Sequence, residues 1–175
     1  MIKFGFNQTM MIADKWTSFK VAGDYNTDIR TLYEAWATTA GIEKWFLRKA
    51  SFYTVPHRTR EPEEFIAKED TYEWYWHGYD DNGSEKGEIL EANGTDFLKF
   101  TFSGGSIVSI NISSRNGISL VELTQENIPI ESDPAKNLFV QCQIGWTFYM
   151  ANLKSVMEGG VDLRNKKPEV DSNFK

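Results

Sequence analysis

The chain has 175 residues, of which 41% are hydrophobic and 25% are charged, and its net charge is −6. This length and apolar content fit one folded domain, and the negative balance argues against nucleic acid and anionic membrane surfaces as partners. The single cysteine, Cys142, allows no internal disulfide and suits a reducing compartment. No segment approaches the roughly 18 apolar residues of a transmembrane helix, and the N-terminus does not resemble a signal peptide. We therefore expect a cytoplasmic protein without membrane insertion.

The first part of the chain predicts one strand followed by two short helices. Residues 1–14 fit either an extra edge strand or an N-terminal extension ahead of an internal translation start. Residues 15–24 read as the first strand, because apolar side chains alternate there. Polar residues 26–28 supply a helix cap, and apolar residues follow at helical spacing over residues 29–36. Residues 42–46 predict the second short helix.

The middle of the chain predicts an antiparallel meander. Its segments alternate apolar and polar residues and are separated by turn-forming pairs such as Asn93-Gly94 and Asn116-Gly117. The charged segment 56–64 reads as a solvated loop. The expected strands cover residues 49–54, 72–77, 85–91, 96–103, 107–113 and 118–125.

The last element is a long amphipathic helix. Asp133 is an N-cap candidate, with Pro134 in the first helical position, and Gly159-Gly160 provides the end. About 26 residues at about 1.5 Å each span about 39 Å, which is long enough to cross a sheet. Gly145 interrupts the middle of this helix at a cost of about 1 kcal/mol relative to alanine. We expect it to allow a close approach between the helix backbone and a neighbouring element.

This order of elements predicts an α+β fold. Nearly every strand has one apolar face, so a curved antiparallel sheet of about six or seven strands would wrap around the long C-terminal helix. The two short helices would close one end. We expect an N-terminal extension over residues 1–14, a single domain over residues 15–164 and a flexible tail over residues 165–175.

Residues 145–164 closely resemble the C-terminal helix signature of proteins similar to the activator of the heat shock protein 90 ATPase. That family belongs to the START-like superfamily, also called SRPBCC or Bet v-like, which has the helix-grip fold. The resemblance implies this fold for the chain. The co-chaperone that names the family carries a separate N-terminal domain, for which this chain is too short. Further matches in the expected order are Trp36, Trp45-Phe46 and segments 87–91, 98–102 and 121–125.

Aromatic residues make up 14% of the chain, and they predict either a hydrophobic pocket or a densely packed core. In a pocket, the tryptophan indole N–H groups and the Tyr72 hydroxyl would be the polar contacts. The side chains expected to line it are Trp36, Trp45, Phe46, Tyr72, Trp74, Trp76, Phe100, Phe102, Ile110, Trp146 and Met150.

No catalytic or metal-binding pattern accompanies these aromatic residues. The chain has two histidines, His57 and His77, whereas a zinc site needs three or four ligands, which argues against a histidine-rich metal centre. Counting leaves carboxylate-only sites open, but we expect no metal and no cofactor. No paired carboxylates, nucleophile elbow or phosphate-binding loop is recognisable. The first hypothesis is a non-catalytic protein that binds a small lipophilic molecule. The alternatives are a heat shock protein 90 co-chaperone-like interaction module and a polyketide cyclase-like enzyme.

Overall fold

The computed structural model describes residues 16–130, 133 and 137–167. The predictions for residues 1–14, for Pro134 and for residues 168–175 of the tail lie outside the described residues.

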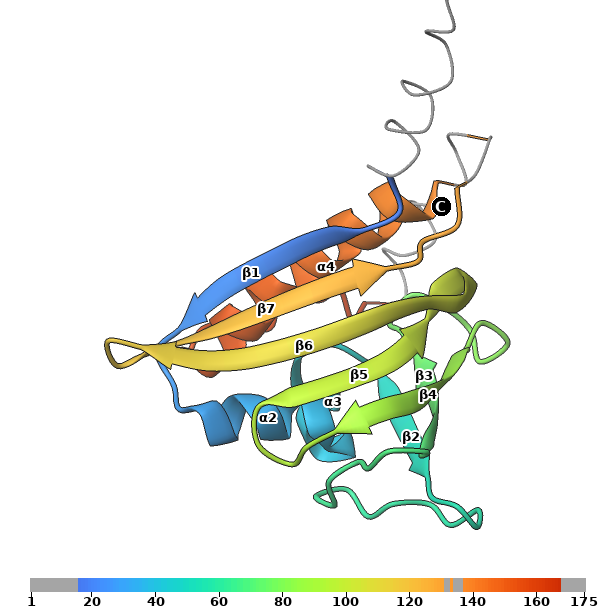
Figure 1. Cartoon of the computed structure of the whole chain (residues 1–175), viewed down its shortest axis with the longest axis horizontal. Helices are drawn as coiled ribbons and strands as arrows, with labels where there is room; N and C mark the ends of the chain where they lie inside the picture. The colour runs from blue at the N-terminus through green and yellow to red at the C-terminus, as the bar shows by residue number, and fades with distance from the viewer. Residues whose placement is uncertain (1–15, 131–132, 134–136, 168–175) are drawn as a thin grey trace, which may run out of the picture.

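Seven strands form one curved antiparallel sheet, which confirms the predicted α+β helix-grip plan (Figure 1). The strand order is β1-β7-β6-β5-β4-β3-β2, so β2 to β7 form the predicted meander and the first strand closes against the last. The strands are β1 (Phe19–Tyr25), β2 (Lys49–Tyr53), β3 (Thr71–Tyr75), β4 (Glu85–Ala92), β5 (Phe97–Phe102), β6 (Ser106–Arg115) and β7 (Ile118–Glu126).

Two short helices follow β1, as predicted. In α2 (Ile29–Ala37), the Asp28 carboxylate accepts a hydrogen bond from the Thr31 amide at 2.9 Å, which is the expected cap. In α3 (Thr39–Trp45), Thr38 caps the first turn by accepting from the Gly41 amide at 2.9 Å. Thr38 therefore ends one helix and begins the next.

The long helix α4 (Leu138–Met157) begins later than the sequence suggested. Its N-cap is Asn137, whose side chain accepts a hydrogen bond from the Val140 amide at 3.1 Å. The prediction that Asp133 caps this helix is therefore wrong. With 20 residues, the helix spans about 30 Å rather than about 39 Å.

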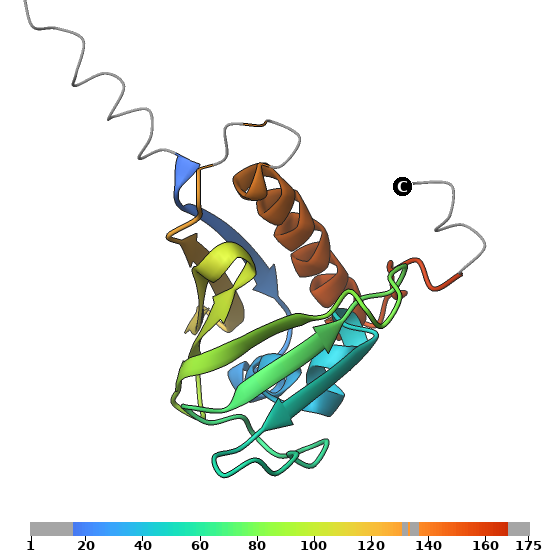
Figure 2. The same cartoon turned by 90° about the vertical axis from the view of Figure 1, so that its right-hand side faces the viewer.

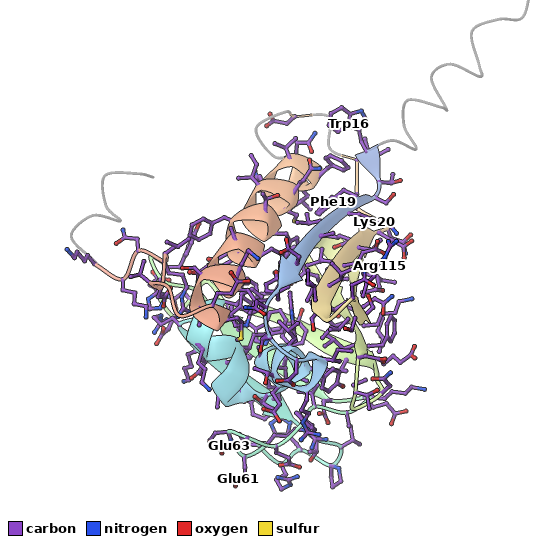
Figure 3. All side chains as sticks on the ribbon, turned by 90° about the vertical axis from the view of Figure 1, so that its left-hand side faces the viewer. Trp16, Phe19, Lys20, Glu61, Glu63 and Arg115 are labelled. Atoms are coloured by element: carbon purple, nitrogen blue, oxygen red, sulfur yellow. The ribbon has the colours of Figure 1, made fainter. Side chains whose placement is uncertain are left out.

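Helix α4 lies across one face of the sheet, along β1, and its C-terminal end reaches α3 (Figure 2). On β1, Phe19 faces α4 and its ring meets Phe139 at 5.3 Å, whereas Lys20 lies on the solvent side and pairs with Glu122 at 2.8 Å (Figure 3). Glu61 and Glu63 are exposed in the charged loop, as predicted. The concave face of the sheet thus holds the core. Among the described residues, none of the helices has the length and apolar character needed to cross a membrane.

The segment after α4 is attached to α3 by buried polar contacts. Asn152, which is fully buried, donates to the Trp45 carbonyl at 2.6 Å and accepts from the Leu163 amide at 2.7 Å. Arg164 donates to the Leu47 carbonyl at 2.7 Å and bonds the carboxylate of Asp162. These bonds fix the C-terminal end of α4 against the short helices.

Candidate functional site

A pocket of about 460 Å³, open to solvent on one side, lies between α4 and the start of β4. Its walls come from the end of α3, the β3–β4 connection, the end of β5 and residues 138–149 of α4. The lining residues are Phe46, Trp76, Tyr79, Gly83, Ser84, Glu85, Phe102, Ser103, Leu138, Gln141, Cys142, Gly145, Trp146 and Tyr149.

One face of α4 forms a wall of this pocket. Leu138, Cys142, Gly145 and Tyr149 line it at intervals of three and four residues, which places them on one side of a helix. A Cβ atom added to Gly145 would meet nothing within 4 Å. The prediction that Gly145 permits a close approach of backbone is therefore wrong: the glycine leaves open space on the pocket side.

Aromatic rings form the apolar surface of the pocket, and Phe46 is their centre. Its ring stacks on Trp146 with centroids 5.0 Å apart and meets Tyr149 edge to face at 4.7 Å and Trp76 at 5.9 Å. Phe102 also contacts Trp146, with ring centroids 5.2 Å apart. Such edge-to-face and offset contacts are the favoured arrangements of aromatic rings, so neighbouring rings support one another's orientation.

The position of Trp146 is fixed by a buried polar chain. Its indole N–H donates to the side-chain oxygen of Gln125 at 2.9 Å, and the Gln125 amide donates to the Ser106 hydroxyl at 2.8 Å. Ser106 in turn donates to the Ser103 carbonyl at 2.8 Å. Gln125 and Ser106 are both fully buried, and an unpaired polar group there would cost about 1–3 kcal/mol. This chain therefore ties α4 to β6 and β7 immediately beside the pocket.

Four of the expected polar contacts belong to residues outside the pocket lining. The Tyr72 hydroxyl donates to the Thr101 carbonyl at 2.6 Å, and the Trp45 indole donates to the Ala35 carbonyl at 2.9 Å. The indole N–H groups of Trp36 and Trp74 are buried without a hydrogen-bond partner among the described residues, and neither residue lines the pocket. Of the expected indoles, those of Trp76 and Trp146 belong to lining residues, and the Trp146 N–H is bonded to Gln125.

Glu85 is the carboxylate among the lining residues. It faces Trp74 across the β3–β4 pairing, so its side chain lies on the concave side of the sheet, and it accepts a hydrogen bond from the Ser103 hydroxyl at 2.7 Å. Burial raises its pKa above the usual range of a glutamate. Burial also raises the pKa of the Cys142 thiol, and it raises the pKa of Tyr149 to about 12. Cys142 and Tyr149 are therefore neutral at pH 7.

The structure brings part of the predicted set together. Phe46, Trp76, Phe102 and Trp146 line the pocket. Glu85, Tyr79 and Tyr149 line it without having been predicted, although Tyr149 stood at helical spacing. The remaining predicted residues lie in the close-packed core beneath and beside it: Trp36, Trp45, Tyr72, Trp74, Phe100, Ile110 and Met150.

Within the described part of the chain, no three His, Cys, Asp or Glu side chains gather into a group that could hold a metal ion. The pocket offers apolar surface, one carboxyl and a few neutral polar groups. Such a lining can bind a small molecule and orient it.

Fold and pocket together define a START-like helix-grip domain. Residues 26–158 match the family described as activator of Hsp90 ATPase homolog 1-like protein, and the chain belongs to this family. The resemblance seen in the sequence is thereby confirmed. Among curated proteins, no sequence matches the chain.

Several solved structures share the fold at low sequence identity. Protein SSP2350 from Staphylococcus saprophyticus is 16% identical with a TM-score of 0.66, and the match covers 84% of this chain and 96% of that one. The Aha1 dimer from Colwellia psychrerythraea is 14% identical with a TM-score of 0.62, covering 82% and 97%. PFC0360w, an HSP90 activator from Plasmodium falciparum, is 16% identical with a TM-score of 0.58, covering 81% and 96%. These similarities concern the fold alone.

Proposed function

We propose that this protein binds a small, largely apolar molecule in the pocket between α4 and β4, without catalysing a reaction on it. The observation that carries the proposal is the preformed pocket itself. Its volume of about 460 Å³ falls within the range of about 300–1,000 Å³ that is usual for small-molecule sites. The open space at Gly145 supports the same proposal, because the glycine destabilises the helix relative to alanine and leaves the pocket side of α4 uncovered.

The test uses N-phenyl-1-naphthylamine, a neutral lipophilic probe whose fluorescence rises in apolar surroundings. We expect saturable binding to the wild-type protein. Gly145→Leu places an isobutyl group in the open space and should weaken binding at least about tenfold, which corresponds to about 1.4 kcal/mol. Ala151→Leu adds a leucine at an exposed position of the same helix and serves as the matched control. Absence of saturable binding, or equal binding by Gly145→Leu, would overturn the proposal.

A second candidate function is association with a chaperone of the heat shock protein 90 class. The family and the activator from Plasmodium falciparum suggest it, and a stripe on α4 favours it. Val140, Ile144 and Phe148 stand four residues apart, and Ile144 is 66% exposed, so an apolar ridge faces solvent along the helix. Single exposed apolar residues are common, but an aligned set is typical of a contact surface.

The chaperone candidate is tested by the ATPase rate of the heat shock protein 90 from the same source. The wild-type chain should stimulate the rate, and Ile144→Glu should abolish the stimulation while Ser113→Glu, an exposed position on the outer face of β6, leaves it intact. An unchanged ATPase rate with wild-type protein removes this candidate. We do not extend the proposal to a polyketide cyclase-like enzyme, because paired acid and base groups are needed for that chemistry and Glu85 is the one carboxylic residue in the lining.

A further inference from the structure

The charge of the pocket points to the kind of molecule that fits it. The lining includes one acidic residue, Glu85, and no lysine, arginine or histidine. No ion pair joins Glu85 to another described residue: the nearby Lys86 bonds Glu73 at 2.9 Å on the opposite face of the sheet. The ionisable groups that approach Glu85 from other elements are Tyr72 on β3 and Cys142 on α4. Both are neutral at pH 7, so a negative charge on Glu85 has no compensation within the pocket.

The local structure holds this carboxyl group in place. Glu85, Gly87 and Ile89 alternate along β4, and Ile89 is fully buried, so the other two side-chain positions face the same concave side. Ser103 donates to one oxygen of Glu85 and comes from the short 3₁₀ turn η2 (Ser103–Gly105) after β5. The hydrogen bond from Ser103 thus holds the carboxyl group at the wall of the pocket.

The other walls add aromatic faces. Trp76, Trp146 and Tyr149 all line the same space as Glu85. The face of an aromatic ring attracts a cation. A carboxylate in apolar surroundings attracts a cation more strongly than an aromatic ring does. The same carboxylate repels an anionic head group, so carboxylate lipids are disfavoured.

We propose that the pocket selects a lipophilic amine, whose ammonium group pairs with Glu85 and whose hydrocarbon or aromatic body lies against Phe46 and Trp146. This inference rests on the proposed function, because it identifies the ligand class of the same pocket.

Three probes with the same hydrocarbon chain length separate the contribution of head-group charge to affinity from that of apolar burial. They are decylammonium, decanol and decanoate, each titrated by calorimetry below its critical micelle concentration. Decylammonium should bind at least about tenfold more tightly than decanoate, with decanol between them. Glu85→Gln keeps the acceptor for Ser103 and removes the charge, so it should weaken decylammonium binding about tenfold, as expected for the loss of one charge-assisted hydrogen bond, and leave decanol binding unchanged. Glu88→Gln, an exposed position on the same strand, is the matched control and should change neither.

The outcomes distinguish this inference from the proposed function. If decanol binds but decylammonium shows no preference over decanoate, or if Glu85→Gln leaves decylammonium affinity unchanged, the amine assignment is wrong and the pocket remains a ligand site. If none of the three probes binds, the pocket is not a ligand site and both proposals are wrong.

Discussion

The glycine in the middle of α4 gives the sharpest test of the pocket geometry. Gly145 lies eight positions into the helix, and its backbone has an ordinary helical conformation. A Cβ atom there would meet nothing within 4 Å, because it would project into the pocket. Gly145→Ala is therefore expected to stabilise the protein.

The size of the effect follows from helix propensity. Alanine is about 0.8–1 kcal/mol more favourable than glycine in a helix interior. The added methyl group would lie at the pocket surface, so its burial adds only part of the roughly 0.8 kcal/mol of a fully buried methylene. We expect the free energy of unfolding to rise by about 1 kcal/mol and the melting temperature by about 2–4 °C, as is usual for a chain of this size.

Urea denaturation and thermal unfolding, followed by tryptophan fluorescence, measure both quantities. Gly41→Ala provides the contrast, because Gly41 is also helical but its added Cβ would lie 2.0 Å from the Glu34 carbonyl oxygen and 2.8 Å from the Ala35 Cα atom. The free energy of unfolding of that variant should fall by about 1–3 kcal/mol or more because of overpacking. A destabilised Gly145→Ala protein would mean that the space beside α4 is filled, and the reasoning about the pocket would be wrong.

Three further predictions concern the polar groups. Asn152→Ala should lower the free energy of unfolding by about 3 kcal/mol in urea titrations, because the side chain makes three buried or part-buried hydrogen bonds, each contributing about 1 kcal/mol; a loss below that of an exposed control would contradict it. Hydrogen bonds from Arg58 lower the pKa of Glu64 to about 2, and Arg164 lowers the pKa of Asp162. Stability from both carboxylates is therefore present above the ordinary pKa near 4 and should be lost as the pH falls toward 2, as urea midpoints between pH 7 and 2 would show. Burial raises the pKa of Glu85, so ionisation costs stability as the pH rises; Glu85→Gln should raise the melting temperature at pH 7 and leave it unchanged at pH 3.

The sheet was predictable because burial on one face imposes a period of two on the sequence. In β5 and β6, the predicted inward residues such as Phe100 and Ile110 are buried, and the turn at Asn116-Gly117 has the positive φ angles that this pair favours. The strand predicted over residues 72–77 ends at Tyr75. Trp76 leaves the strand and reaches the pocket instead, which alternation alone could not show.

The start of α4 shows the limit of local signals. Asp133-Pro134 is a favourable helix start, but Asn137 is an equally suitable cap, and the structure uses Asn137. Nothing in the local sequence ranks two such caps four residues apart. The packing of α4 against the sheet determines which one is used.

Glu85 was missed for a related reason. A glutamate at the first position of an alternating strand suggests a side chain that points outward, since charged residues are seldom on an inner face. The buried Ile89, four positions later in β4, indicates the opposite. The register with Trp74 on β3 then settles the direction, and register across strands is not encoded in any single strand.

Whether the aromatic space is filled or hollow depends on the position of α4, and two parts of this helix have different roles. Its buried residues, Trp146, Met150, Asn152 and Leu153, all lie from Trp146 onward. Hydrogen bonds fix this part to β7 through Gln125 and to α3 through the Trp45 carbonyl. Before Trp146 the helix has no buried side chain, and Leu138, Gln141, Cys142 and Gly145 of this first part line the pocket. The anchored second part thus holds the first part of α4 beside the pocket. Side chains added along residues 138–145 should therefore change ligand affinity before they change the fold.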